Sequence, residues 1–276
     1  MPKYSIVASD LDGTLLNNSS EISFENIKAI DALNKLGVYF VPSTGRSFSE
    51  IPVQLRENDA VRFYICSNGA MVFDKLKGPR ILNCISNGVG QEILDLLTSF
   101  ESEINIRHNG YIIADSKIKS LQHYKRLNVV DAHIDCICKY SKRVDDFNKY
   151  AYNADNIEVF TVFFRNYADK MYCKKQLEQN TELIVVEGFE YNLEIMSTKA
   201  GKGNALLALA DMLKIQRSKT IGIGDSGNDI TSIESAGLGL AVSNATDSLK
   251  AVADDIICSN EEHIVAYVLE NFVKPK

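Results

Sequence analysis

The feature of this chain that most restricts its fold is a repeated alternation of short apolar segments with amphipathic ones. Residues 4–8 and 38–42 are apolar runs with the length of a buried strand, and residues 23–37 between them carry apolar side chains at helical spacing. Another apolar run covers residues 62–66. Short buried strands separated by amphipathic helices indicate an α/β fold with a parallel sheet covered on both faces.

The C-terminal part of the chain repeats this pattern. It contains expected helices at 201–214, 228–237 and 261–273 and expected strands at 220–224, 239–241 and 255–258. The middle differs, because two rounds of a helix followed by strands are joined by hairpins in place of crossovers. Its expected helices cover 91–102 and 168–179, and its expected strands cover 104–107, 111–115, 159–164, 183–188 and 191–196. We therefore expect residues 1–84 and 192–276 to form one α/β domain, and residues 85–191 to form an α+β domain inserted into it.

Composition excludes several classes of function. The formal net charge of -6 argues against a nucleic-acid-binding surface or an anionic-membrane surface. No apolar stretch reaches the roughly 18 residues of a membrane span, and we expect no secretory leader before the strand near residue 4, because no basic segment followed by a long apolar one is found there. We expect a cytoplasmic protein with six reduced cysteines, a small-molecule partner, and a monomeric or weakly dimeric state.

Polar clusters follow the expected strands of the α/β domain. They contain Asp10 and Asp12; Ser43, Thr44, Gly45 and Arg46; Asn68; and Asp225, Asn228 and Asp229. Each cluster alone is compatible with an ordinary turn. Ligands of parallel α/β sheets bind beyond the carboxyl ends of the strands, so the clusters are expected to share one crevice.

The aspartates point to a metal. Side chains two positions apart in an extended segment lie on the same side, so Asp10 and Asp12 can reach one site. Together with Asp225 and Asp229 they form an oxygen-rich cluster whose mutual repulsion calls for a cation, and hard oxygen ligands suit Mg²⁺. The alternative interpretation is a solvated acidic rim.

Other residues suit a phosphate group. Thr44 offers a hydroxyl and neighbouring backbone N–H groups, and Asn228 precedes a helix whose N-terminus attracts anions. Lys202 lies near the start of a helix, where the helix dipole disfavours a cation, so we expect it to neutralise charge; the alternative is a surface lysine. Residues 222–227 also match the dinucleotide pattern G-x-G-x-x-G, but Asp225 would bring a carboxylate against the pyrophosphate. A dehydrogenase is therefore the least favoured hypothesis.

The segments "SDLDGTLL", "STGR", "KGNAL" and "GDSGNDI" together resemble the haloacid dehalogenase superfamily of phosphatases, and more closely its Cof-type branch with a large α+β cap of the C2 type. The resemblance covers nearly the whole chain, with the motifs in the family's order. It implies a Rossmann-like core, with residues 85–191 as a cap that selects the substrate. One departure is Ser9, where the family often has phenylalanine.

The resemblance also implies roles for individual residues. Asp10 would be the nucleophile that forms an aspartyl-phosphate, and Asp12 would be the general acid and base. Thr44 and Lys202 would hold the transferring phosphoryl group. Mg²⁺ would be bound by Asp10, the backbone carbonyl of Asp12 and Asp225, with Asp229 acting through water. Phosphate or substrate contacts are expected from Thr44, Gly45, Arg46, Asn68, Lys202 and Asn228.

These observations predict a Mg²⁺-dependent phosphomonoesterase that acts on small phosphorylated metabolites, such as sugar phosphates or a phosphorylated cofactor. A phosphosugar mutase resembling phosphomannomutase is the nearest alternative, since it would use the same nucleophile. A sensor that binds a phosphometabolite without turnover is a third hypothesis, although binding alone does not need Asp12.

Overall fold

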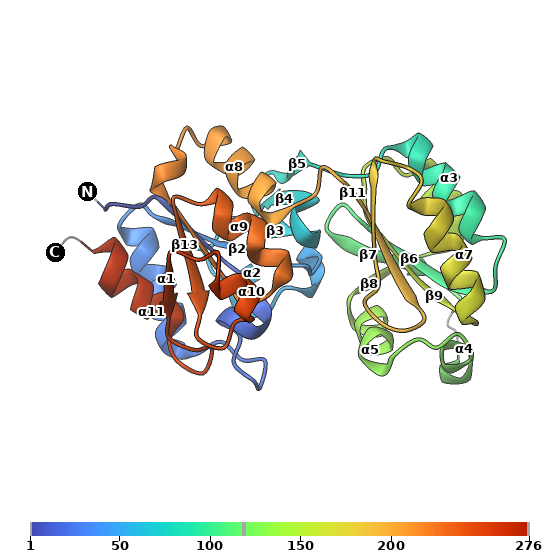
Figure 1. Ribbon diagram of the computed structural model, residues 1–276, viewed down its shortest axis with the longest axis horizontal. Coiled ribbons are helices and arrows are strands. Elements are labelled where there is room, and N and C mark those ends of the chain that lie inside the picture. Colours follow the sequence, from blue (N-terminus) through green and yellow to red (C-terminus); the bar gives the residue numbers. More distant parts are fainter. Residues whose placement is uncertain (1, 118–119, 275–276) are drawn as a thin grey trace. The chain divides into compact units, whose positions relative to one another are not determined.

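The computed structural model describes residues 2–117 and 120–274 and separates the chain into two compact units (Figure 1). Unit 1 comprises Met1–Arg46, Ile51–Ile81 and Gly201–Lys276, and unit 2 comprises Ser47–Glu50 and Leu82–Ala200. The sequence analysis placed the division after residues 84 and 191, whereas the contacts place it after Ile81 and Ala200. The shift at the second boundary arises because residues 192–197 form a strand of the unit 2 sheet.

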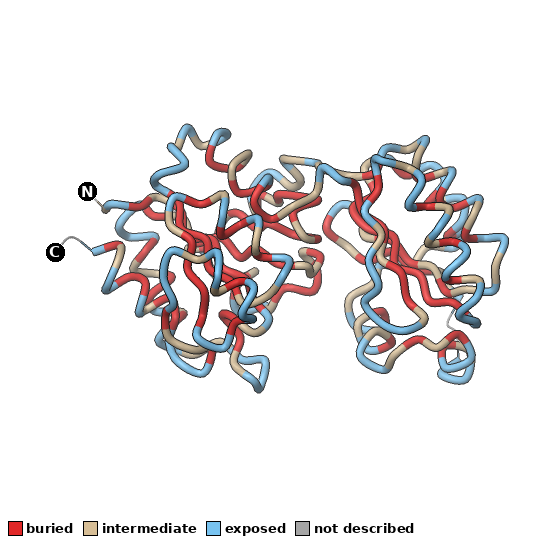
Figure 2. Tube along the Cα trace, in the orientation of Figure 1, coloured by how far each residue is buried: buried red, intermediate tan, exposed pale blue. Residues whose placement is uncertain are grey.

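The main sheet of unit 1 confirms the predicted parallel α/β fold. Its strands are β1 (Ile6–Ser9), β2 (Tyr39–Pro42), β12 (Thr220–Gly224), β13 (Leu238–Val242) and β14 (Asp255–Ile257). They lie in the order β14-β13-β12-β1-β2, and every neighbouring pair is parallel. The strands form the buried centre of this unit (Figure 2). Because β1 lies between β12 and β2, the segments that follow these three strands are neighbours at one edge of the sheet.

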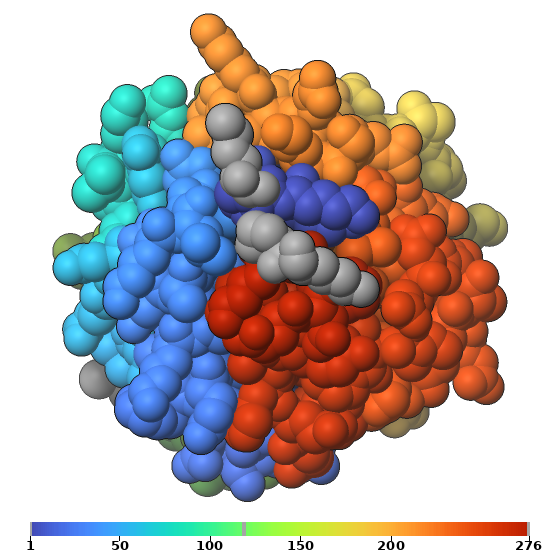
Figure 3. All heavy atoms as spheres, turned by 90° about the vertical axis from the view of Figure 1, so that its left-hand side faces the viewer, coloured from blue at the N-terminus to red at the C-terminus, as the bar shows by residue number. Residues whose placement is uncertain are grey.

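Six α-helices belong to the described part of unit 1. They are α1 (Phe24–Lys35), α2 (Val53–Arg56), α8 (Lys202–Met212), α9 (Ile230–Ser235), α10 (Asp247–Lys250) and α11 (Ile264–Val268), and α1 and α9 contact strands of the main sheet. Ser23 caps α1 as predicted, because its hydroxyl accepts a hydrogen bond from the backbone N–H of Asn26. Leu206 and Leu209 of α8 pack in one cluster with Ile6 of β1. α11 lies beside α1, as the red and blue segments of Figure 3 show.

The strand expected at residues 62–66 forms part of a second, smaller sheet. β3 (Phe63–Cys66) pairs antiparallel with β4 (Met71–Asp74) in a three-stranded sheet that β5 (Gly78–Leu82) completes. Its link to the main sheet is a parallel bridge between Ser43 and Ile65. The predicted parallel arrangement is therefore confirmed at this bridge, but β3 belongs to a separate sheet, because the turn at residues 67–69 reverses the chain into β4 and no crossover helix follows.

Unit 2 is an α+β unit, as predicted, built on a six-stranded sheet. Its strands are β6 (Ser102–His108), β7 (Tyr111–Asp115), β8 (Ser141–Val144), β9 (Ile157–Phe164), β10 (Leu183–Val186) and β11 (Asn192–Ser197). The order is β10-β11-β9-β6-β7-β8. The pairs are antiparallel except for β7 with β8, which are parallel. The sequence analysis missed β8, and the expectation of hairpins in place of crossovers is wrong at this pair because two helices connect its strands.

Helices pack on both faces of this sheet, and the side chains of β9 alternate between two clusters. The helices are α3 (Asn87–Leu97), α4 (Leu121–Arg126), α5 (Asp131–Tyr140), α6 (Phe147–Asn153) and α7 (Tyr167–Leu177). Val162 and Phe164 of β9 pack in the core formed with α3, α6 and α7, whereas Phe163 between them packs with residues of α4 and α5. Successive side chains of a strand point to opposite faces, so β9 is buried along its whole length.

Two expectations drawn from composition concern the cysteines and the membrane. All six cysteines are free thiols, in keeping with the prediction of reduced cysteines. Within the described residues, no helix has both the length and the apolar character that a membrane crossing requires.

A buried ion pair holds the short segment Ser47–Glu50 in unit 2. The Glu50 carboxylate accepts hydrogen bonds from Arg107 Nε at 3.3 Å, from Ser47 N at 2.7 Å and from Cys136 Sγ at 3.0 Å. The side chains of Glu50 and Arg107 are 8% and 12% exposed. Burial acts to raise the pKa of Glu50, but the Arg107 charge and these hydrogen bonds outweigh it and hold the pKa below its ordinary value.

Replacing Arg107 with methionine is expected to lower the free energy of unfolding by about 3–5 kcal/mol at neutral pH, because the buried Glu50 carboxylate loses its cation. The loss should shrink in acid, since the stabilisation from a carboxylate with a lowered pKa disappears as the pH falls through that pKa. Urea denaturation of the two proteins at several pH values measures both effects. Arg126→Met is the control, because Arg126 pairs with Glu101 at the surface and such pairs contribute at most about 1 kcal/mol. Equal losses in the two variants would contradict the prediction.

Candidate active site

The candidate site lies at the carboxyl edge of the unit 1 sheet. Ser9, the last residue of β1, is in register with Ile223 of β12 and Pro42 of β2. The three loops that begin one or two residues later therefore start at the same level. A fourth loop follows β3, which is bridged to the segment after β2. These loops carry the polar clusters predicted from the sequence, and Lys202 joins them from the start of α8.

The loop after β1 separates its two aspartates by burial. Asp10 is 5% exposed, and its backbone N–H donates to Ile223 O at 2.9 Å, which continues the strand pairing. The Asp12 side chain is 56% exposed. The chain turns at Gly13, directly after Asp12, and the φ of Gly13 is +74°. A Cβ at Gly13 would lie 2.7 Å from Asp225 Oδ2, so both the backbone conformation and the space require glycine there.

Lys202 connects the two acidic loops. Its Nζ donates to Asp10 Oδ1 at 2.7 Å and to Asp229 Oδ1 at 2.6 Å, and its side chain is fully buried. Burial acts to lower the pKa of Lys202, but the two carboxylates outweigh it and raise this pKa, so the lysine stays charged. Burial raises the pKa of Asp10, with Lys202 opposing the shift and the Asp229 charge adding to it. The interpretation of Lys202 as a surface lysine is therefore wrong.

The loop after β12 is organised by Asp229. Asp229 Oδ2 accepts hydrogen bonds from the backbone N–H groups of Asp225 at 3.1 Å and Ser226 at 3.2 Å. Its other oxygen accepts from Lys202, so both oxygens of this buried carboxylate are engaged. Asp225 is half-buried, and its Oδ1 accepts from Thr14 Oγ1 at 3.1 Å. Burial, reinforced by the Asp229 charge, raises the pKa of Asp225.

These carboxylates can hold a cation. Asp10, Asp225 and Asp229 each place a carboxylate oxygen within 4.8 Å of the other two. Burial is the main cause of the raised pKa values of Asp10 and Asp225, and the Asp229 charge adds to it, so a further positive charge would favour the ionised carboxylates. Carboxylate oxygens are the ligands that hard divalent cations such as Mg²⁺ prefer, so the donor set fits that ion.

The loop after β2 is fixed to the loop after β3 by backbone hydrogen bonds. Thr44 N donates to Ile65 O at 2.9 Å, Ser67 N donates to Arg46 O at 2.9 Å, and Asn68 N donates to Thr44 O at 3.0 Å. Thr44 is buried, and its hydroxyl oxygen accepts from Arg46 N at 3.1 Å. The segment with Thr44 is therefore held by hydrogen bonds at both its backbone groups and its hydroxyl oxygen.

A left-handed turn brings the loop after β3 against the start of α8. Ser67, Asn68 and Gly69 have φ values of 51°, 53° and 85°. A Cβ at Gly69 would lie 2.2 Å from the carbonyl oxygen of Gly201, so glycine permits this close approach next to Lys202. The Asn68 side chain lies against Gly45, and its Oδ1 accepts a hydrogen bond from Asn228 Nδ2 at 3.0 Å.

The structure thus brings every residue predicted for the site to one edge of unit 1. Arg46 differs in detail from the expectation of a phosphate or substrate contact, because its guanidinium is paired with Asp12. The sequence analysis missed Thr14, and it missed Asn244, whose Nδ2 donates to Gly13 O at 2.8 Å. Thr14 lies in the segment "SDLDGTLL" that resembles the family, so that motif carried a signal for it, and Asn244 lies two residues after strand β13.

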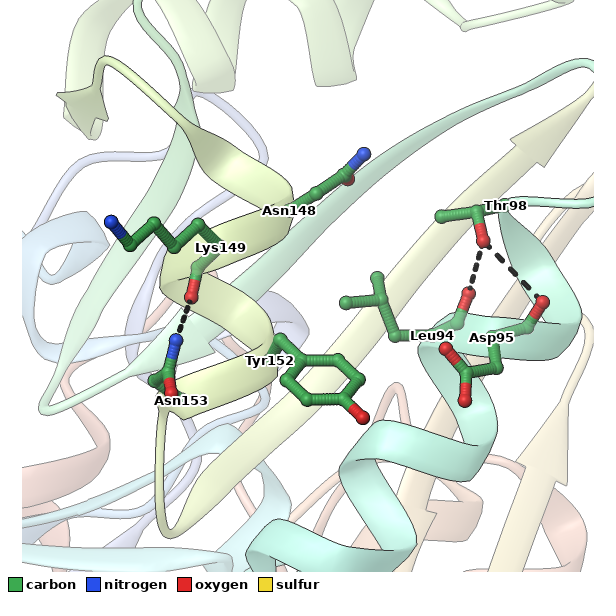
Figure 4. A pocket seen from close by; sticks show the side chains of 7 residues that line it. All are labelled: Leu94, Asp95, Thr98, Asn148, Lys149, Tyr152 and Asn153. Carbon is green, nitrogen blue, oxygen red and sulfur yellow. Dashed lines mark hydrogen bonds between the residues drawn. The ribbon is translucent and has the colours of Figure 1, made fainter.

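A hollow in unit 2 shows no comparable chemistry. It has a volume of about 310 Å³ and lies between α3 and α6 (Figure 4). Its lining residues are Leu94, Asp95, Thr98, Asn148, Lys149, Tyr152 and Asn153. Thr98 Oγ1 donates to Leu94 O at 2.9 Å and Asn153 Nδ2 donates to Lys149 O at 2.7 Å, so these polar groups are bonded within their own helices. The acidic cluster in unit 1 therefore remains the candidate site.

Comparison with known proteins agrees with this geometry. The family model described as haloacid dehalogenase-like hydrolase matches residues 7–269. The chain belongs to this family. Its resemblance to the Cof-type branch and the predicted Rossmann-like core are confirmed. Members of this family are hydrolases, so the chain is an enzyme. The cluster of Asp10, Asp225 and Asp229 is in keeping with this.

Relatives of this hydrolase extend over its whole length. Phosphatase YwpJ of Bacillus subtilis is 29% identical, with 97% of this chain and 99% of YwpJ covered. The 5-amino-6-(5-phospho-D-ribitylamino)uracil phosphatase YwtE of the same organism is 27% identical, with 97% of each chain covered. A solved haloacid dehalogenase-like hydrolase from Bacteroides thetaiotaomicron has a TM-score of 0.81 at 23% identity, covering 97% of this chain and 99% of that one. This last likeness shows the shared fold.

Proposed function

We propose that this haloacid dehalogenase-like hydrolase is a Mg²⁺-dependent phosphomonoesterase for small phosphorylated metabolites. The observation that carries the proposal is the buried Lys202, which bridges Asp10 and Asp229 beside Asp225. This arrangement keeps a carboxylate and a cation together in a dry site, where both can act on a phosphoryl group. The named activities of YwpJ and YwtE support a phosphate ester as the substrate class.

In the first step, a carboxylate oxygen of Asp10 attacks phosphorus and the bond from phosphorus to the leaving oxygen breaks. Asp12 gives its proton to that oxygen, so an alcohol departs and an aspartyl-phosphate remains. Its greater exposure suits Asp12 to this role, because a proton shuttle must reach both substrate and water. In the second step Asp12 takes a proton from water, the water oxygen bonds to phosphorus, and Asp10 leaves as a carboxylate with inorganic phosphate as the product.

The remaining residues bind and orient the phosphoryl group. Lys202 offsets the repulsion between the Asp10 carboxylate and the incoming dianion, and the Thr44 hydroxyl together with the N–H of Gly45 would donate to phosphoryl oxygens. Asn68 and Asn228, which are hydrogen-bonded to each other, would line the same side. Asp10, Asp225 and the backbone carbonyl of Asp12 would hold Mg²⁺, with Asp229 acting through water, and the ion would supply positive charge to the phosphoryl oxygens.

Unit 2 is proposed to be the substrate-selecting cap. Its two segments are inserted between the three segments of unit 1, and this insertion together with its separate core supports the assignment. Replacing the aspartates of the acidic cluster should therefore remove activity on all substrates. Substitutions in unit 2 should instead alter which phosphate ester is preferred.

The direct test is phosphate release from p-nitrophenyl phosphate and from a panel of sugar and polyol phosphates, with Mg²⁺ and with EDTA. Metal-dependent release of inorganic phosphate is the expected result. Transfer of the phosphoryl group to a second sugar hydroxyl would instead identify a mutase. Tight binding of a phosphate ester without turnover, unchanged in Asp12→Ala, would identify a sensor.

Magnesium affinity is expected to fall as the pH is lowered. Burial raises the pKa values of Asp10 and Asp225 in the metal-free protein, so protons compete with the cation for these carboxylates. The apparent affinity should fall by up to about tenfold per pH unit for each proton displaced. Isothermal titration calorimetry in buffers of different ionisation enthalpy counts these protons. Asp10→Asn should release fewer protons, and a pH-independent affinity in the wild type would contradict the prediction.

A further inference from the structure

The partner of Asp12 in this structure is Arg46. Arg46 Nε donates to Asp12 Oδ2 at 2.8 Å, and Arg46 Nη2 donates to Asp12 Oδ1 at 2.5 Å. The planar guanidinium therefore engages both carboxylate oxygens at once, which fixes the plane of the carboxylate as well as its position. The side chain of Asp12 is 56% exposed, and without such a partner an exposed aspartate samples several rotamers.

The backbone on both sides of this pair is held in place. Arg46 N donates to Thr44 Oγ1, and Arg46 O accepts from Ser67 N, so the arginine starts from a fixed point. Asp12 lies in a turn that is closed by hydrogen bonds from Leu15 N to Asp10 O and from Leu16 N to Leu11 O. A rigid guanidinium between two fixed loops can set the direction of a side chain that packing leaves free.

We propose that Arg46 is a positioning residue that holds the Asp12 carboxylate in the orientation needed for proton transfer, and that it acts on catalysis through Asp12 rather than through a phosphoryl oxygen. This inference rests on the proposed phosphatase function. Protonation of the departing oxygen requires a carboxylic acid within hydrogen-bond distance and correctly aligned. A displacement of the acid by about 1 Å can cost on the order of 10²-fold in rate.

The test is a double-mutant cycle with Arg46→Ala, Asp12→Asn and the double variant, assayed on two substrates. With a polyol phosphate, whose alcohol leaves only when protonated, Arg46→Ala should lower kcat by about 10- to 100-fold with KM little changed. With p-nitrophenyl phosphate, whose phenol leaves without a proton, the loss should be several-fold smaller. In the Asp12→Asn background Arg46→Ala should have almost no further effect on kcat, because the group that it positions is already missing.

Two further variants sharpen the test. Arg46→Lys keeps the charge but not the paired donors, so it should remain close to Arg46→Ala in kcat. Arg62→Ala removes a similar pair in the same unit, in which Arg62 Nε and Nη2 donate to Asp74 at 3.2 and 3.0 Å, and it should leave kcat and KM unchanged. Multiplicative losses in the double variant, or a raised KM as the main effect of Arg46→Ala, would show a direct substrate contact and overturn the proposal.

A crystal structure of Arg46→Ala tests the same contact without turnover. The Asp12 carboxylate should occupy more than one rotamer in the variant and a single one in the wild type. A single, unmoved conformer in the variant overturns the positioning role. If the wild type hydrolyses no phosphate ester, the proposed function fails, and this structural comparison still decides whether Arg46 orients Asp12.

Discussion

Asp10→Asn is expected to abolish turnover while leaving the protein folded. Asparagine has nearly the same shape and can still accept the hydrogen bond from Lys202 Nζ, but its amide cannot attack phosphorus. Loss of a nucleophile that works together with its neighbours costs on the order of 10⁴-fold or more in kcat. Steady-state hydrolysis of p-nitrophenyl phosphate in saturating Mg²⁺ measures this loss. Acid quenching of a reaction with radiolabelled substrate should trap a base-labile phosphoryl group on the wild type and none on the variant.

The stability of Asp10→Asn separates a chemical effect from a structural one. Burial disfavours the Asp10 carboxylate, so a neutral amide should leave the free energy of unfolding equal to or greater than that of the wild type. Asp211→Asn provides a matched control, since Asp211 is exposed at the end of α8 and should tolerate the same change without loss of activity. Residual turnover of Asp10→Asn within tenfold of the wild type would argue against Asp10 as the nucleophile.

Lys202→Met is expected to reduce both activity and stability. The variant removes the cation that contacts the buried Asp10 and Asp229 carboxylates, and breaking such a buried pair costs about 3–5 kcal/mol. If Lys202 holds the phosphoryl group as proposed, removing its charge should also lower kcat by about 10²–10³-fold. Urea denaturation in EDTA and hydrolysis in saturating Mg²⁺ measure the two effects separately.

The destabilisation of Lys202→Met should depend on pH and on metal. Lys202 opposes the effect of burial on Asp10, so without the lysine the pKa of Asp10 rises further. A carboxyl group whose pKa is raised by folding destabilises the protein above that pKa, so the loss should be largest in base and should shrink as Asp10 takes up a proton. Mg²⁺ should restore part of the stability through binding to the folded state.

Lys75→Met is the control for the lysine experiment. Lys75 lies in the same unit and pairs with Asp59, whose side chain is fully exposed, so its removal should cost no more than about 1 kcal/mol. A variant at Lys202 that keeps the wild-type stability in EDTA at neutral pH would show that the two carboxylates do not need the lysine.

Much of the fold could be predicted because burial imposes a periodic pattern. The parallel strands β1, β2 and β12 are short and mostly apolar, and helix α1 has apolar residues at helical spacing with a serine cap. β8 could not be found in the same way, because its sequence SKRV is polar and it lies at the edge of its sheet. The place of β3 was missed because sheet membership depends on how the chain reverses at Ser67–Gly69, which a strand pattern does not record.

Most candidate site residues that could be predicted from the sequence lie in loops that directly follow apolar strands. Asp10, Asp225 and Asp229 follow apolar strands, and the structure brings their carboxylates together. The pairing of Arg46 with Asp12 spans 34 positions and depends on where two loops place their side chains, so no local pattern reports it. The roles of these residues in catalysis remain predictions that the variants above test.

The segment Ser47–Glu50 bears on how this enzyme could be re-engineered. It directly follows Arg46, yet its contacts place it in unit 2, where Arg107 holds Glu50 and the Ser49 N–H donates to Gly110 O at 2.9 Å. A chimera that exchanges only residues 82–200 for those of a relative would replace the residues that these four contact in this chain, Arg107 and Gly110 among them. A chimera that exchanges unit 2, the proposed cap, should therefore include both Ser47–Glu50 and Leu82–Ala200 from the same relative, so that the contacts between the two segments are kept.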